Sequence, residues 1–302
     1  MSAKPAYAPS VAGRQTGETA LASSTRIARI VAVSGSQAVA IIDAQARERN
    51  EGRIEIDLDK RIGRRVGQIV ALSRTEWLLL QYLAANAGRV MLNNQVLSNV
   101  GGTVQASSGM TVSAATLDNT GGYLKGTGSQ ALSVTTTGAL TNAVAGGTGG
   151  FLGGNGVVTV HAGSLRNAGQ IYAGSALTVA SQGTLVNDGG ALQAMSALNV
   201  SAISSLSNRN GRIAGGAGDS AATLAVSAGS IDNTGGRVAN AGHGVSTIGT
   251  GGSIVNRGGT LGGQGNATLN ATSLDNSQSG HVVAGQSLTL GLGGMNNAAG
   301  TL

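Results

Sequence analysis

The stretch LRNAGQIYAGSALTVASQGTLVNDGG, residues 165–190, decides the fold because it contains one full period of a repeat. It begins and ends with the same block, an aliphatic residue, any residue and an asparagine, with glycine close behind. Between the two blocks, Leu177 and Val179 alternate with small polar residues, which is the pattern of a strand with one buried face. The stretch therefore predicts short strands separated by glycine-containing turns.

The block recurs from residue 97 onward, and its asparagines lie 20 to 25 residues apart with a mean spacing of 22. The ten asparagines are Asn99, Asn119, Asn142, Asn167, Asn187, Asn208, Asn233, Asn256, Asn276 and Asn297. A unit of this length cannot bury its apolar face alone, whereas stacked units share a continuous core. We therefore predict a mainly β chain in which residues 97–302 form a right-handed parallel β-helix, a solenoid with coils of about 22 residues.

The composition agrees with a narrow solenoid interior. Glycine accounts for 51 of the 302 residues, and only six residues are aromatic. Aromatic side chains bury large areas in ordinary globular cores, so a core of that kind is not expected here. Hydrophobic residues make up 41% of the chain and the net charge is only +6, which argues against disorder. Leucine, valine and isoleucine are expected to point inward, with glycine at the corners.

The repeated asparagine has a structural explanation. Asparagine tolerates the left-handed conformation of tight turns, and its amide can bond both its own turn and the equivalent asparagine one coil away. Ten copies suit a ladder along one corner better than a catalytic or ligand site, of which a protein needs one. We predict that these ten residues form a structural ladder.

The sequence lacks the motifs of common catalytic, metal-binding and phosphate-binding sites. There is no cysteine, hence no disulfide or zinc–thiolate site, and neither a phosphate-binding loop nor a nucleophile elbow occurs. The three histidines are widely separated and lack metal-ligand spacing: His161, His243 and His281. Four aspartates flank the repeated asparagine without the calcium-binding nonapeptide pattern: Asp118, Asp188, Asp232 and Asp275. We expect no catalytic residue, no cofactor, no metal and no enzyme activity.

The first third of the chain has a different character. Residues 1–99 carry a net charge of +5, whereas residues 100–302 carry +1. We predict that residues 1–25 are disordered and that residues 26–51 form a β-hairpin. Residues 52–96 are predicted to form a small α+β segment, in which a capping box from Ser73 to Glu76 opens a helix that ends at Gly88.

The asparagine blocks, with L-x-V pairs between them, resemble the repeat region of filamentous haemagglutinins and related two-partner-secretion exoproteins over residues 97–302. The resemblance implies a β-helical stalk, export through an outer-membrane transporter, and adhesion to host or neighbouring-cell surface components. The first 24 residues lack the apolar segment of a signal peptide. We therefore expect the chain as written to stay in the cytoplasm. We also expect it to self-associate through an open solenoid end.

The stretch from Ile54 to Val100 resembles the first half of the winged-helix effector domain of response regulators. A DNA-binding transcriptional regulator is therefore the alternative function. In that family the DNA-reading helix follows this segment, but here the repeats begin instead. We accordingly expect no sequence-specific nucleic-acid binding. A further alternative is that the chain is a fusion or assembly artefact with no single function.

Overall fold

The structure is a computed structural model that describes residues 96–217 and 221–302, together with six strands that precede them. The chain divides into two compact units, Met1–Ala87 and Gly88–Leu302. The six preceding strands are β1 (Arg29–Ser34), β2 (Gln37–Ile41), β3 (Arg53–Asp57), β4 (Ile62–Arg65), β5 (Gln68–Val70) and β6 (Arg89–Met91).

Strands β1 to β5 form one antiparallel sheet in chain order. Strand β2 pairs with β3, so the strands expected in residues 26–51 and in residues 52–96 share this sheet. The disorder predicted for residues 1–25 and the helix predicted from Ser73 to Gly88 lie outside the described residues.

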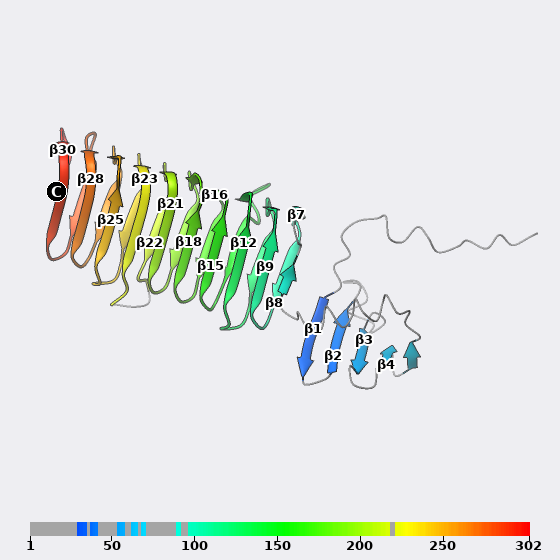
Figure 1. Cartoon of the computed structure of the whole chain (residues 1–302). Coiled ribbons are helices and arrows are strands. Elements are labelled where there is room, and N and C mark those ends of the chain that lie inside the picture. Colours follow the sequence, from blue (N-terminus) through cyan, green and yellow to red (C-terminus); the bar gives the residue numbers. More distant parts are fainter. Residues whose placement is uncertain are drawn as a thin grey trace, which may run out of the picture. The chain divides into compact units, whose positions relative to one another are not determined.

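The second unit is a solenoid in which each coil contributes three strand segments (Figure 1). One segment of each coil belongs to a nine-stranded parallel sheet. Its strands are β8 (Thr103–Ala106), β11 (Tyr123–Gly126), β14 (Phe151–Gly154), β17 (Gln170–Ala173), β20 (Ala191–Ala194), β22 (Arg212–Gly215), β24 (Arg237–Asn240), β27 (Thr260–Gly263) and β29 (His281–Ala284).

The other two segments of each coil belong to a 16-stranded sheet that bends around the core. Besides β6, one row of it contains β9 (Met110–Ala114), β12 (Leu132–Thr136), β15 (Val158–Ala162), β18 (Leu177–Ser181) and β25 (Ser246–Thr250). A second row contains β7 (Val96–Ser98), β10 (Thr116–Asp118), β13 (Ala139–Ala143), β16 (Ser164–Ala168), β19 (Leu185–Val186) and β26 (Ser253–Val255). Four long strands run through both rows: β21 (Leu198–Ser207), β23 (Leu224–Asp232), β28 (Ala267–Asp275) and β30 (Leu288–Asn296).

Parallel, in-register pairing places like residues above one another and builds the core. Val158 is the partner of Leu177, which is in turn the partner of Leu198. All three side chains are fully buried, whereas the residue that follows each of them along its strand faces outward. Nine coils at about 4.8 Å each give a stack roughly 40 Å long. The predicted mainly β fold with a parallel β-helix is confirmed.

In two coils of the array, the sequence lacks the pair of large apolar residues that alternates with polar residues in the other coils. Ser246 and Ala267 stand where the other coils carry leucine, valine or methionine, and Ile248 and Leu269 complete their pairs. Ser246 is buried, and within the described residues its hydroxyl has no hydrogen-bond partner. Because a small side chain can occupy an inward position, an alternation of large apolar residues alone could not locate these coils.

Solenoid pairing begins before residue 97, the boundary expected from the asparagine blocks. Strand β6 pairs in parallel with β9 and places Val90 beside Val112. This strand lacks an asparagine block of its own, which is why the repeat pattern did not include it.

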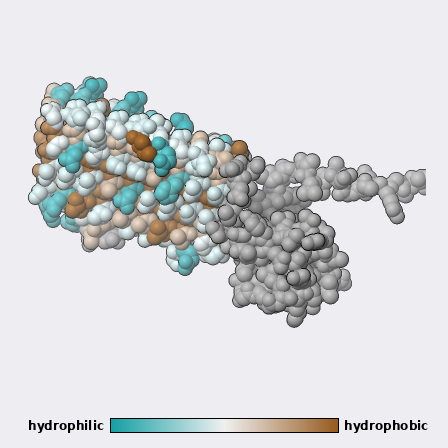
Figure 2. Space-filling view, in the orientation of Figure 1, coloured by the Kyte–Doolittle hydropathy of each residue, from teal (hydrophilic) through white to brown (hydrophobic). Residues whose placement is uncertain are grey.

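In the described part of the chain, no helix has the length and apolar character needed to cross a membrane. Figure 2 shows a mostly pale and teal surface over the described coils, with hydrophobic residues in small separate spots.

Candidate functional site: the asparagine corner

The ten predicted asparagines occupy one corner of the solenoid, at equivalent positions of successive coils. Eight of them directly follow a strand segment, as Asn187 follows β19, and Asn142 and Asn167 lie near the ends of β13 and β16. The side chains from Asn119 to Asn276 are completely buried, Asn99 is 6% exposed, and Asn297 in the last coil is partly exposed. The structure thus brings all ten residues together in one row.

Hydrogen bonds connect the asparagine side chains along this row. The Nδ2 atom of each asparagine donates to the Oδ1 atom of the next, in nine bonds of 2.6 to 2.7 Å. The Nδ2 of Asn187 also lies 3.2 Å from the carbonyl oxygens of Gly190 and Arg212. Its backbone N–H donates to the carbonyl of Ser207 at 2.7 Å. Burial without partners would be costly for these amides, and the repeat supplies the partners.

In seven of the ten coils, glycine stands three positions after the asparagine, and in five of these it also stands two positions after it; the two positions serve different purposes. The residue two positions on has a positive φ, as at Gly189 and Gly258, and in the left-handed region glycine avoids the cost of a Cβ. The residue three positions on has no room for a side chain. A Cβ at Gly211 would overlap the carbonyl oxygen of Asn187 and the Oδ1 of Asn208.

The last coil carries alanine at the left-handed position, where Ala299 has a φ of 58°. Replacing Ala299 with glycine is expected to stabilise this coil by about 1 kcal/mol, because the left-handed region disfavours a Cβ. Amide hydrogen exchange in residues 288–302 should slow correspondingly. Ala298→Gly, at a neighbouring residue without positive φ, serves as the control and should give no slowing. Equal effects of the two substitutions on hydrogen exchange would show that the left-handed conformation of Ala299 does not destabilise the coil.

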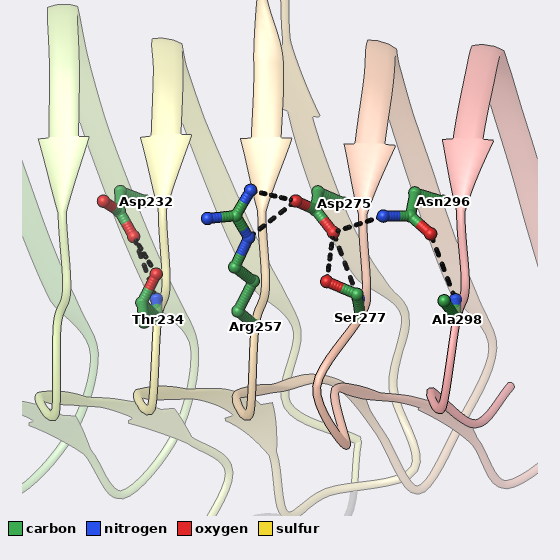
Figure 3. A network of polar contacts seen from close by, with 7 residues as sticks. All are labelled: Asp232, Thr234, Arg257, Asp275, Ser277, Asn296 and Ala298. Carbon is green, nitrogen blue, oxygen red and sulfur yellow. Dashed lines mark hydrogen bonds and ion pairs between the residues drawn. The ribbon is translucent and has the colours of Figure 1, made fainter.

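Charged and polar side chains flank the ladder (Figure 3). The Oδ2 of Asp275 accepts from Arg257 in the preceding coil at 2.6 and 2.7 Å. Its Oδ1 accepts from the hydroxyl of Ser277 at 2.7 Å and from the amide of Asn296 at 3.3 Å. One carboxylate therefore fixes its own turn and also contacts both neighbouring coils.

The same arrangement occurs two coils earlier. Asp232 accepts from Arg209 at 2.6 and 2.7 Å, and from the hydroxyl of Thr234 at 2.6 Å. Burial is the largest influence on the pKa of Asp232 and acts to raise it, but Thr234 and Arg209 together bring it below the ordinary value. The pKa of Asp275 is also lowered, mainly by the hydroxyl of Ser277 and, against the opposing effect of burial, by Arg257.

A lowered pKa makes the stability contribution of Asp275 depend on pH. The folded protein holds the charged form, so this contribution is present above the ordinary aspartate pKa and is lost as pH falls through the lower, folded value. Asp275→Asn should therefore lower the melting temperature at pH 7, with a difference from wild type that shrinks below about pH 4. Thermal unfolding at stepwise lower pH measures this. A difference that stays constant down to pH 2 would contradict it.

The remaining candidate groups do not converge. His161, His243 and His281 lie at exposed positions on separate segments. Across residues 96–217 and 221–302, no three histidine, aspartate, glutamate or cysteine residues come together in a way that could hold a metal ion. Sequence reasoning did not anticipate the arginine–aspartate pairs. Their signal was an arginine directly after the asparagine of one coil and an aspartate directly before the asparagine of the next.

Comparison with known proteins agrees with this architecture. The Haemagglutinin repeat family matches residues 80–144 and 262–302. The "tRNA nuclease CdiA-2" of Burkholderia pseudomallei (strain 1026b) is 42% identical over 109 residues, which are 35% of this chain and 4% of that protein. The chain therefore spans only a small part of the length of this relative. No solved structure matches the chain.

The coils and their ladder define a structural protein segment, a parallel β-solenoid stalk. The matches to residues 80–144 and 262–302 and to the relative support a repeat region of the filamentous haemagglutinin type. Nothing in the comparisons supports a DNA-binding regulator, and the winged-helix resemblance of residues 52–96 remains a prediction.

Proposed function

We propose that this chain is a non-catalytic segment of a secreted exoprotein, and that its coils hold other parts of that protein away from the cell. The observation that carries the proposal is the uninterrupted parallel pairing of nine coils, with buried asparagines bonded through all of them. A shared core and a continuous ladder couple each coil to its neighbours, which favours a stiff rod over a flexible linker.

Export with an outer-membrane transporter and adhesion to host or neighbouring-cell surfaces are parts of this proposal. The cellular test is protease treatment of intact cells that express the chain from its own locus. Surface display predicts that added protease removes the chain while a cytoplasmic marker survives. A chain that survives with the cytoplasmic marker would contradict display and would instead support the cytoplasmic retention expected from the N-terminal sequence.

The absence of enzyme activity is the second part of the proposal. The charged groups that contact one another at the asparagine corner are the arginine–aspartate pairs, in which each carboxylate is already bonded. Because the relative is named as a tRNA nuclease, tRNA is the informative substrate. The purified chain should leave tRNA intact. Cleavage that disappears on a point substitution in this chain would overturn the proposal.

A further inference from the structure

Two asparagines of the chain stand directly before a glycine, Asn155 and Asn210. Asparagine is chemically labile in proteins, because the backbone nitrogen of the next residue can attack its side-chain amide carbon. A following glycine favours the attack, since it has no Cβ to obstruct the approach and its main chain rotates readily. These two dipeptides are therefore the positions at which the unfolded chain loses side-chain amide nitrogen fastest.

The stacking of coils requires both glycines. A Cβ at Gly156 would overlap the carbonyl oxygens of Ser129 and Gln130 in the preceding coil. A Cβ at Gly211 would overlap the carbonyl oxygen of Asn187, again in the preceding coil. A side chain at either position would therefore force neighbouring main chains apart, so the fold itself places glycine after both asparagines.

Hydrogen bonds hold the dipeptide at the asparagine corner. Asn210 has a φ of 52° and takes the left-handed position that glycine fills in other coils, as at Gly189. Its N–H donates to the carbonyl of Thr234 at 3.0 Å, and the N–H of Gly211 donates to the carbonyl of Asn208 at 3.1 Å. The nitrogen that would attack is therefore engaged in a bond beside the buried ladder, and that bond must open before the nitrogen can react.

The dipeptide in the turn between β14 and β15 has fewer restraints. The side chain of Asn155 is exposed, and its Nδ2 donates to the carbonyl of Thr127 at 2.8 Å. Both residues of the dipeptide lie outside the strands, and within the described part of the chain the N–H of Gly156 donates to no acceptor. The attacking nitrogen is therefore available, and the side-chain bond that has to open is one that water can replace.

We propose that Asn155 is a site of spontaneous deamidation in the folded protein, whereas the asparagine corner protects Asn210. The nitrogen of Gly156 loses its proton and attacks Cγ of Asn155. As this C–N bond forms, the bond from Cγ to Nδ2 breaks, and Nδ2 leaves as ammonia with the proton that Gly156 lost. Water then opens the succinimide ring. Cleavage at Cγ gives aspartate, and cleavage at the main-chain carbonyl gives isoaspartate.

The product alters the turn that carries it. A carboxylate at position 155 has no N–H to donate, so its oxygens face the carbonyl oxygen of Thr127 without the hydrogen bond that the amide made. Isoaspartate also adds one carbon to the main chain, beside a glycine whose neighbours leave no room for a Cβ. Both products loosen this turn. Because ammonia is lost, the change is irreversible and accumulates with the age of the molecule.

The test follows both sites in the purified full chain during incubation in mildly alkaline buffer made with water enriched in heavy oxygen. Pepsin digestion at low pH, where the reaction is slow, and mass spectrometry then measure the share of each site that has exchanged nitrogen for solvent oxygen. A second sample is unfolded in guanidinium chloride, where the two sites should react at similar rates. In the folded chain, Asn155 should react within a few-fold of its unfolded rate. Asn210 should be slowed by about tenfold or more, the equivalent of one buried hydrogen bond that must open.

Two variants examine the causes. Asn208→Ala removes a side chain of the ladder, so the reaction at Asn210 should accelerate severalfold while the rate at Asn155 stays unchanged. Asn155→Asp places a carboxylate in the turn between β14 and β15 and should speed amide hydrogen exchange in residues 127–130. Asn155→Gln is its matched control, because the longer amide can still donate, and it should change this exchange less. Equal exchange in the two variants would contradict the loosening of the turn.

Two outcomes would overturn the proposal: folding that slows Asn155 as strongly as Asn210, or an Asn210 that reacts in the folded chain as fast as in the unfolded one. Both are measured on the wild-type chain, so they decide the matter even where a variant fails to fold. The reaction needs only water, and neither outcome bears on the proposed stalk function.

Discussion

Gly211→Ala is expected to destabilise the solenoid by about 3 kcal/mol or more, at the upper end of the usual cost of overpacking. A Cβ at this position would overlap the carbonyl oxygen of Asn187 and the side chain of Asn208. The main chain would have to move, and the bond between the two asparagine side chains, 2.7 Å long, would have to lengthen with it. Urea denaturation of the full chain, followed by circular dichroism, measures the loss.

The control for this substitution is Gly249→Ala. Gly249 lies in β25, and a Cβ there would meet no atom within 4 Å. Its replacement should be neutral or slightly stabilising, because alanine restricts the unfolded chain more than glycine does. Similar losses at Gly211 and Gly249 would show that close approach at the corner is not the cause.

Asn208→Ala should cost about 1–3 kcal/mol, the range for leaving buried polar groups without partners. Asn208 accepts from Asn187 and donates to Asn233, so its removal leaves an unpaired donor on one side and an unpaired acceptor on the other. The effect should be smaller than that of Gly211→Ala, since the cavity left behind leaves the main chain in place.

Asn297→Ala provides the comparison at the last coil. Asn297 accepts from Asn276 at 2.7 Å, and its own amide reaches only the carbonyl of Gly300, at 3.4 Å. Because one neighbouring side chain loses its partner instead of two, we expect a smaller cost than at Asn208. Equal and negligible losses at both sites would contradict a stabilising ladder.

The sequence was sufficient to predict the architecture because the same requirement recurs in every coil. Each coil of a parallel stack needs an inward aliphatic residue such as Leu185 and a tight turn that glycine can adopt. The repeat is therefore visible in the sequence as a regular spacing of these residues. Where the requirement is weaker, the period is lost. Ser246 fills an inward position with a hydroxyl, and β6 joins the sheet without an asparagine.

Features that depend on register could not be predicted in the same way. Arg257 meets Asp275, and Phe151 stands beside Tyr123, only because coils of unequal length return to the same register. The coil that begins at Asn142 takes up its extra residues in a small turn, where Ala145 and Thr148 form an isolated bridge. Counting residues along the chain does not show which loop contains the extra residues of a longer coil. The neighbours on the outer surface of the nine-stranded sheet therefore follow only from the strand pairing.

The asparagine ladder also gives the rod a direction. Each Nδ2 donates toward the following coil and each Oδ1 accepts from the preceding one, from Asn99 to Asn297, so the amide dipoles all point the same way. The two ends of such a rod are chemically distinct. Two copies placed end to end with opposite orientation would set donor against donor, whereas a head-to-tail arrangement continues the series. Any assembly through the solenoid ends should therefore be heterologous and capable of open-ended growth, with no closed two-fold dimer.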